Sequence, residues 1–228
     1  MKKRTFLKIS LAAASSALIP SPILAMAHQG QKKLRTAHLG VGGMGAADLA
    51  AIASHADVEV VALCDVDSNA LNEAIKDYPS AKTFKDYRVM LTEMAEEIDA
   101  VIVSTPDHTH APPSIMAMEM NKPVYCQKPL AHHVSEVRAM RKMAEQKNLV
   151  TQMGIQVHSF YDYKLATLLI QSGIIGKVRR VRAWSPKNWG YDGPAFKGRD
   201  PIPATLDWNL WLGTAAARPY KDKVYQPG

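Results

Sequence analysis

Residues 34–65 read LRTAHLGVGGMGAADLAAIASHADVEVVALCD, and they carry the strongest fold signal in the chain. An apolar run leads into the pattern G-x-G-x-x-G, which Gly40, Gly42 and Gly45 form. A run of small residues suited to a helix follows, and a second apolar run ends in Asp65, 20 residues after Gly45. This order of strand, glycine turn, helix, strand and acid predicts a unit that binds a dinucleotide.

Each part of the pattern has a physical task. Gly40 permits the tight turn out of the strand, Gly42 lets a pyrophosphate approach the backbone, and Gly45 lets the helix pack on the strand. Free N–H groups and the dipole at the helix start attract the diphosphate. Asp65 accepts hydrogen bonds from ribose hydroxyls but would repel a 2′-phosphate, so the sequence favours NAD over NADP. The residues predicted to bind the cofactor in this turn are Gly40, Gly42, Gly43, Met44 and Gly45.

Composition bounds the classes of function. The chain has 228 residues, of which 47% are hydrophobic, which suffices for a sizeable core in one or two domains. The net charge is +7, but residues 1–27 hold four basic residues and no acidic one, which leaves +3 for the remainder. No basic stripe with interleaved aromatic residues remains, so we expect no nucleic-acid partner. Cys64 and Cys126 end strands that should not be neighbours, so we expect two buried thiols without a disulfide.

Residues 1–27 have the features of an export signal peptide. The basic start MKKRTFLK leads into a short apolar run, and Ala25, Met26 and Ala27 form an A-x-A cleavage site. The apolar run is far shorter than the ~20 residues that a membrane span needs, so we expect no stable span. KRTFLK resembles the twin-arginine signal with lysine in place of the first arginine, and the ordinary secretory route stays open. We expect an exported, periplasmic protein; the alternative is a membrane-anchored or disordered tail.

Strands and helices alternate downstream at the spacing of a parallel sheet with right-handed crossovers. We therefore expect a doubly wound α/β domain over residues 34–154. The expected strands are 35–39, 58–64, 81–84, 98–105, 123–127 and 149–154. The expected helices are 46–54, 68–77 with Ser68 as its cap, 86–94, 113–120 and one from about 135 with Val137, Met140 and Ala144 on its core face.

Residues 155–228 are expected to begin a second α+β domain. A helix at 162–171 precedes VRRVRAW at 178–184, whose alternation predicts a strand with one solvent-facing side. A polar loop rich in Gly and Pro, 185–203, leads to LDWNLWLG at 206–213. Trp208 and Trp211 lie there at i and i+3, a spacing more often seen in a core than in a stacking platform.

Ligands of open parallel sheets bind at the carboxyl ends of the strands, and three predicted strands end in polar residues. These ends read STPDHTH at 104–110, QKP at 127–129 and MGIQVHS at 153–159. Lys128 is the predicted catalytic residue, because a partly desolvated lysine beside a cationic nicotinamide would have a lowered pKa and could hydrogen-bond the reacting oxygen. A solvated lysine at a strand end is the alternative.

The histidines give weaker signals. His108 and His110 follow Pro106 at a helix start, where packing or capping is the commoner role. His132 and His133 are expected to be solvated, and His158 is an even choice between the substrate cleft and solvent. No pair has metal-ligand spacing supported by further ligands, so we expect no metal.

The ordered motifs resemble the Gfo/Idh/MocA oxidoreductase family, and most of all its exported bacterial members. The resemblance rests on the glycine turn, CDVD at 64–67, STPDHTHAPPS at 104–114, VYCQKPLA at 124–131, and the later IGKVRRVRAW and LDWNLWLG. It covers roughly residues 34–228. It implies a Rossmann domain that binds NAD, a second domain built on a large open sheet, a sugar, polyol or related carbohydrate substrate, and a homo-oligomer at full length.

The resemblance also implies roles for individual residues. The family's Glu-Lys-Pro motif falls on residues 127–129, so Lys128 would be the active-site lysine, and it would contact the substrate. The further cofactor contacts would be Ser104, Thr105, Pro106, His110, Gln127 and Gln156.

Two departures from the family pattern stand out. Gln127 replaces the usual glutamate, and the loss of that anion should make a neutral Lys128 easier to reach. Only residues 155–228 are left for the second domain, and the family's further Asp and His have no place in them. We therefore expect the sequence to be the N-terminal part of a longer protein.

Three functions remain open at this point. The first is an NAD-dependent sugar or polyol dehydrogenase. The second is a glycosidase, because some members of the family use tightly held NAD to oxidise, eliminate and restore a sugar. The third is a non-catalytic nucleotide- or sugar-binding protein, which the Gln127 departure and the missing half favour.

Overall fold

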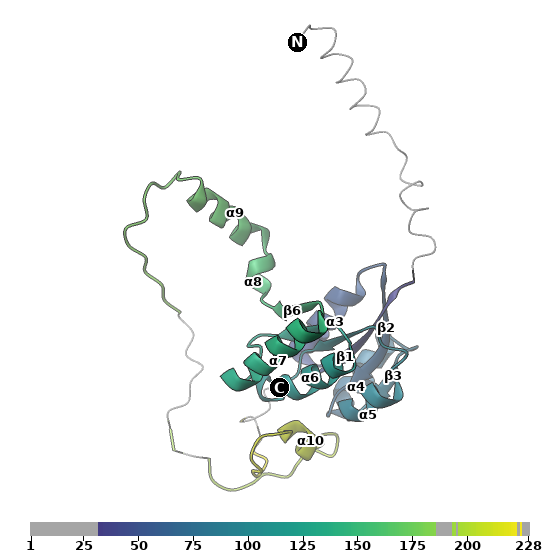
Figure 1. Ribbon diagram of the computed structural model, residues 1–228. Helices are drawn as coiled ribbons and strands as arrows, with labels where there is room; N and C mark the ends of the chain where they lie inside the picture. The colour runs from purple at the N-terminus through teal and green to yellow at the C-terminus, as the bar shows by residue number, and fades with distance from the viewer. Residues whose placement is uncertain (1–31, 186–192, 195, 223, 225–228) are drawn as a thin grey trace. The chain divides into compact units, whose positions relative to one another are not determined.

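A six-stranded parallel sheet organises the chain in the computed structural model, which describes residues 32–185, 193–194, 196–222 and 224 (Figure 1). The chain divides into two compact units, Met1–Lys33 and Leu34–Gly228, and the second contains every element discussed below. The expected signal peptide, residues 1–27, lies outside the described residues. The strand order is β3-β2-β1-β4-β5-β6, so the predicted doubly wound parallel sheet is confirmed.

The strands agree closely with the hydrophobic pattern. They are β1 (Leu34–Leu39), β2 (Val58–Cys64), β3 (Lys82–Phe84), β4 (Ala100–Val103), β5 (Val124–Gln127) and β6 (Thr151–Gly154). The helices of the sheet domain are α3 (Gly43–Ala53), α4 (Ser68–Asp77), α5 (Tyr87–Glu93), α6 (Ala111–Glu119) and α7 (Val134–Lys147), with the short 3-10 helix η2 (Asp107–Thr109) before α6. Beyond β6 lie α8 (Gln156–Ser159), α9 (Tyr161–Gln171) and α10 (Trp208–Leu212).

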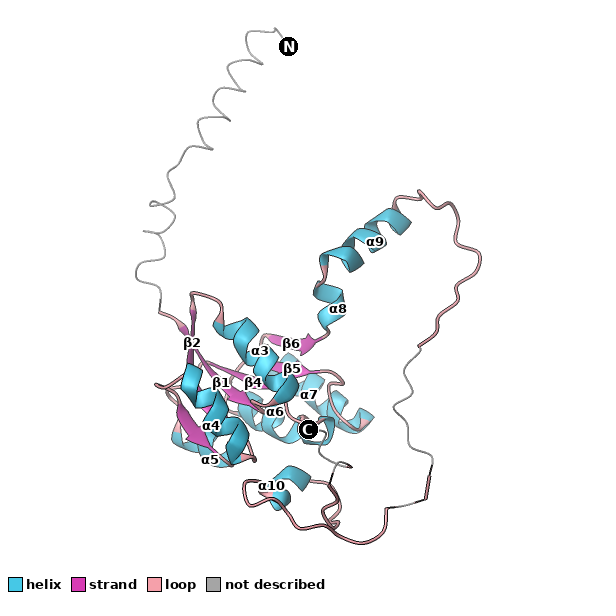
Figure 2. Ribbon diagram, turned by 180° about the vertical axis from the view of Figure 1, so that it is seen from behind, coloured by secondary structure: helices cyan, strands magenta, loops and turns pink. Residues whose placement is uncertain are grey.

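The strand register aligns the ends that carry the candidate site. Leu39, the last residue of β1, is opposite Cys64 in β2 and Val103 in β4. Gly40, Asp65 and Ser104 therefore leave the sheet side by side at its carboxyl edge. Figure 2 shows these three strands next to one another in the sheet.

Two apolar clusters hold helices to the sheet. One joins α3 and α4 to the sheet through Leu49, Leu71 and Leu63 of β2. The larger one joins α5, α6 and α7 to β1, β2, β4 and β5, with Met90, Met118 and Met140 among its buried members. Successive side chains of a strand point to opposite faces, and strands buried on both faces are therefore almost continuously apolar. This explains the uninterrupted run in β4.

The cap of α4 differs from the expectation. Asp67 is the N-cap, and its carboxylate accepts the N–H of Asn69 at 2.9 Å. Ser68 is instead the first helical residue, and its hydroxyl donates to the carbonyl of Thr205 at 3.2 Å. Asp and Ser are both favoured at the N-cap, so the sequence pattern does not distinguish Asp67 from its neighbour Ser68 as the cap.

The predicted strand at 178–184 is wrong. These residues have no regular secondary structure, and all of them are exposed. An alternating pattern gives a segment one apolar and one polar face, but a strand also needs a hydrogen-bonded neighbour. In the described part of the chain no strand pairs with residues 178–184. The expected α+β sheet of the second domain is accordingly not seen there, and α9 is the element that the sequence predicted correctly in this region.

The two cysteines are free and buried, as expected. They lie in β2 and β5, which are not adjacent in the sheet. Burial raises the pKa of the Cys64 thiol above its usual range and raises the pKa of Cys126 to about 11. Both therefore act as small apolar side chains. Across residues 32–185, 193–194, 196–222 and 224, no helix combines the length and the apolar character needed to cross a membrane.

Candidate functional site

Two glycines of the turn after β1 are required by close backbone contacts. Gly40 has φ +76°, and a Cβ on it would lie 2.7 Å from the carbonyl oxygen of Ser104. A Cβ on Gly45 would lie 2.0 Å from the carbonyl oxygen of Gly40. Any side chain at either position would push β1 away from β4 or from α3. The turn therefore holds the start of α3 directly above the ends of these strands.

The start of α3 is an open cradle. Gly42 is the N-cap and has no side chain to satisfy the first N–H groups of the helix. Gly42, Gly43 and Met44 are exposed, and a Cβ on Gly43 would meet nothing within 4 Å. Unsatisfied N–H groups and the positive end of the helix dipole thus face free space, which is the environment that a diphosphate needs.

Asp65 lies beside this cradle at the end of β2. Its carboxylate accepts the N–H of Val41 at 2.8 Å and the N–H of Asp67 at 2.9 Å. Burial raises the pKa of Asp65, and these backbone donors oppose that rise. Each oxygen has two lone pairs, so the fixed carboxylate keeps the capacity to accept two ribose hydroxyls. The turn, the cradle and Asp65 together fit a dinucleotide.

The end of β4 is held to the end of β5 by a histidine. His110 is almost fully buried; its Nδ1 lies 2.7 Å from the carbonyl oxygen of Pro129, and its Nε2 lies 2.6 Å from that of Thr105. The packing role that the residue pattern favoured is therefore present. Pro106 is exposed and Thr105 half-buried at this edge, so both are open to a ligand.

A buried polar network that the sequence did not reveal lies beneath the turn. The Gln127 amide nitrogen donates to both carboxylate oxygens of Asp48, at 3.0 and 2.8 Å, and the hydroxyl of Ser104 donates to the same carboxylate at 2.6 Å. The Gln127 amide oxygen accepts the backbone N–H of Lys128 at 3.0 Å. Position 127 carries an amide and no anion, but a buried carboxylate, that of Asp48, lies against that amide.

Asp48 escaped the sequence analysis because its partner is 79 positions away. One signal could have found it: Asp48 is an acid beside Leu49 on the inner side of a helix made of small and apolar residues. A carboxylate in such a position needs a buried donor. The amide of Gln127 supplies that donor.

Lys128 follows this network at the carboxyl edge of β5. Its backbone is fixed by Gln127, while its side chain is exposed. The described residues therefore do not supply the partial desolvation that the sequence argument invoked. What they supply is position, because β5 lies beside β4 and the residues after both strands share one edge.

The strand β6 brings two more predicted residues to this edge. Gly154 pairs with Gln127, and Gln156 begins α8 directly afterwards. The amide of Gln156 donates to the sulfur of Met44 at 3.6 Å, so it reaches the start of α3. His158 is exposed, and its ring stacks on Tyr163 at 5.0 Å between centroids.

The other three candidate histidines, His108, His132 and His133, have contacts within the protein. His108 contacts the backbone carbonyl of Trp211 at 2.9 Å. His132 and His133 are exposed and contact each other, and His133 is the N-cap of α7. Within the described ranges no group of three or more His, Cys, Asp or Glu residues could hold a metal ion.

Comparisons with known proteins agree with this geometry. A family model described as "Oxidoreductase family, NAD-binding Rossmann fold" matches residues 34–155. An inositol 2-dehydrogenase of Salmonella typhimurium is 31% identical over 152 residues, which are 65% of this chain and 44% of that protein. A glycosyl hydrolase family 109 protein of Stenotrophomonas maltophilia is 35% identical over 137 residues, 56% of this chain and 29% of that protein.

Solved structures show the same similarity. The crystal structure of a myo-inositol 2-dehydrogenase from Lactobacillus plantarum superposes with a TM-score of 0.61 at 31% identity, over 64% of this chain and 43% of that one. This chain spans less than half the length of the relatives that it matches.

Proposed function

The chain belongs to the Gfo/Idh/MocA oxidoreductase family, and from that premise we propose that it is the nucleotide-binding part of an NAD-dependent oxidoreductase that acts on a sugar, polyol or related carbohydrate. The observation that carries the proposal is the alignment of Gly40, Asp65 and Ser104 at one sheet edge, below an uncapped helix start. The inositol dehydrogenases among the relatives support a polyhydroxylated substrate.

The residues of the chain divide the work of holding the cofactor. The N–H groups at the start of α3 bind the diphosphate, and Asp65 accepts the ribose hydroxyls. Ser104, Thr105 and Pro106 line the edge next to the turn. A bound nicotinamide supplies a site that accepts or donates hydride.

Lys128 is the proposed acid–base group for the substrate oxygen. Gln127 accepts its backbone N–H, and its side chain is exposed at the edge of the sheet. Oxidation of an alcohol requires removal of a proton from the hydroxyl, and a lysine amine within hydrogen-bond reach can accept it. Replacement of Lys128 by methionine should abolish turnover by the complete protein while leaving NAD affinity within about two-fold, because the diphosphate and ribose contacts do not involve it.

The first test concerns the cofactor itself. Titration calorimetry of the chain with NAD should show binding, and NADP should bind more weakly because its 2′-phosphate would face the Asp65 carboxylate. Asp65→Ala should weaken NAD and narrow the gap to NADP. Equal or tighter binding of NADP by the unsubstituted chain would contradict the role of Asp65.

A second candidate function is an NAD-dependent glycosidase, which the similarity to a glycosyl hydrolase family 109 protein favours. Nicotinamide absorbance distinguishes the two. A dehydrogenase changes it in proportion to turnover, whereas a glycosidase that restores its cofactor cleaves substrate with no net change.

We also propose that residues 1–27 direct export and are removed. The basic start, the short apolar run and the A-x-A site support this proposal. Mass spectrometry of the protein from its native host should then find His28 at the N-terminus, and a cytoplasmic protein that retains residues 1–27 would refute it.

A further inference from the structure

A segment far outside the family match contacts the cofactor edge of the sheet. Residues 205–213 lie beside the end of β2, where they form an isolated antiparallel bridge. The N–H of Asp207 donates to the carbonyl of Val66 at 2.9 Å, and the N–H of Ser68 donates to the carbonyl of Thr205 at 2.9 Å. Val66 directly follows Asp65, so the segment is anchored next to the predicted ribose ligand.

The same segment also contacts the end of β4. The Nε2 of His108 lies 2.9 Å from the carbonyl oxygen of Trp211, and the two rings are 4.9 Å apart. A Cβ on Gly213 would lie 2.8 Å from the side chain of Thr109, so the backbone there closely approaches η2. The segment therefore extends from the residues after β2 to the residues after β4, on either side of β1 and its glycine turn.

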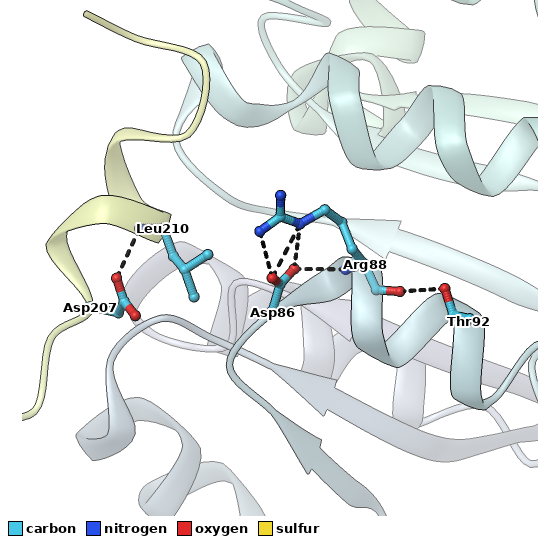
Figure 3. A network of polar contacts seen from close by, with 5 residues as sticks. All are labelled: Asp86, Arg88, Thr92, Asp207 and Leu210. Atoms are coloured by element: carbon cyan, nitrogen blue, oxygen red, sulfur yellow. Dashed lines mark hydrogen bonds and ion pairs between the residues drawn. The ribbon is translucent and has the colours of Figure 1, made fainter. Parts of the chain in front are cut away.

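The segment is a folded element with its own core. Asp207 caps α10 by accepting the N–H of Leu210 at 2.9 Å, as Figure 3 shows. Leu206, Trp208 and Leu212 are buried together. Trp211 stacks on Trp208 at 4.7 Å and remains partly exposed. An indole held in this way offers a fixed flat surface.

The position of the segment identifies what it borders. In a doubly wound sheet the acid at the end of the second strand binds the adenosine ribose, and the diphosphate lies at the glycine turn. The adenosine half of a dinucleotide therefore occupies the space beside Asp65, between the loops that follow β2 and β4. Residues 205–213 contact both of those loops.

We propose that residues 205–213 form the outer wall of the adenosine pocket, with Trp211 and His108 providing aromatic surface for the adenine base. This inference rests on the proposed cofactor site and adds to it a part of the chain that the family match does not reach. Adenine is flat and stacks well on aromatic side chains, and loss of one such stack weakens binding about ten-fold or more. The ligand class that the wall recognises is an adenine nucleotide, independent of the nicotinamide.

The test uses the full chain and the two halves of the cofactor. Calorimetry should show that Trp211→Ala weakens NAD and AMP by the same factor, about ten-fold, and leaves nicotinamide mononucleotide unchanged. The matched control is Trp184→Ala, which removes a tryptophan that is 83% exposed and lies outside the segment. This control should bind all three ligands as the unsubstituted chain does.

A second measurement covers the case in which Trp211→Ala fails to fold. AMP should quench the tryptophan fluorescence of the unsubstituted chain, and Trp211→Phe should retain AMP affinity but lose most of the quenching. Equal quenching in Trp211→Phe, or unchanged AMP affinity in a folded Trp211→Ala, would overturn the wall. Tighter AMP binding by Trp211→Ala would also overturn it, because the segment would then obstruct the pocket. If the unsubstituted chain bound neither NAD nor AMP, the cofactor site itself would be refuted.

Discussion

Asp48 and Gln127 form a buried pair of an acid and an amide, with little of either side chain open to water. The Gln127 amide donates to the Asp48 carboxylate, and the carboxylate in turn fixes which end of the amide faces Lys128. An amide has two different ends, and a charged partner on one side selects between them. Asp48 therefore acts as a positioning residue for the backbone of Lys128, although it touches neither substrate nor Lys128 itself.

Gln127→Glu should convert this network into a pH-dependent one. Two carboxylates at about 3 Å cannot both ionise, so one would keep its proton above its normal range. A carboxyl whose pKa is higher in the folded than in the unfolded state stabilises the fold at low pH, and this stabilisation is lost as pH rises. Urea unfolding of Gln127→Glu should therefore show a free energy of unfolding that falls by about 1.4 kcal/mol per pH unit above pH 5, up to the raised pKa.

The double variant Asp48→Asn/Gln127→Glu is the matched control. It exchanges the acid and the amide, which restores one charge and one donor in the same place. Its stability should return to the shallow pH dependence of the unsubstituted chain. An equally steep dependence in the double variant would show that the slope does not arise from this pair.

His38, the last residue but one of β1, gives a second prediction at the scale of a residue. Its ring is buried, its Nε2 lies 3.1 Å from the hydroxyl of Thr36, and its Nδ1 has no partner within the described structure. Burial lowers the pKa of His38 to about 4. The unfolded chain binds a proton at about pH 6.5, so this histidine should destabilise the fold as pH falls from 6.5 towards 4.

The expected effect is a loss of about 2 kcal/mol between pH 7 and pH 5. Urea unfolding of the unsubstituted chain and of His38→Leu at the two pH values isolates it, since the leucine cannot titrate. The pH-dependent loss should be smaller in His38→Leu by about that amount. Identical pH dependences would contradict the assignment.

At the scale of elements, local patterns determined most of the sheet domain. The boundaries of β2 and α4 were predicted to the residue, because apolar runs and helical spacing are local properties. The strand at 178–184 failed because pairing depends on a neighbour that its own residues do not specify. The contact of α10 with η2 joins positions 103 residues apart, so no local pattern could have predicted it.

The start of α4 offers a test of which residue caps the helix. Asp67→Ala removes the acceptor for the Asn69 N–H and should lower the free energy of unfolding by about 1 kcal/mol. Ser68→Ala leaves this cap in place and loses only a hydroxyl bond to Thr205, so it should cost less. Chemical denaturation of the two variants decides between them, and a larger loss for Ser68→Ala would favour the serine cap that the sequence suggested.

For the whole molecule, the well-packed sheet domain is followed by a stretch whose apolar side chains face solvent. All six strands and both large clusters are built from residues between 34 and 154. Past β6, by contrast, the chain from 156 to 185 is exposed throughout, and it includes Leu168 at 62%, Ile174 at 71% and Trp184 at 83% exposure. The nucleotide-binding half thus has the contacts of an independent domain, and the following stretch does not.

This exposed stretch should make the chain associate in solution. When large apolar side chains that are open to water become buried against another such surface, the free energy of the system falls. Sedimentation velocity of the chain should therefore show concentration-dependent self-association. Leu168→Glu should reduce it, because a carboxylate on α9 would have to be desolvated in any such contact.

The matched control Val134→Glu introduces the same charge at a single exposed apolar residue of α7, 67% exposed, and should leave association unchanged. A chain that stays monomeric at all concentrations, or one in which both glutamates act equally, would show that the stretch from 156 to 185 does not drive contact between copies.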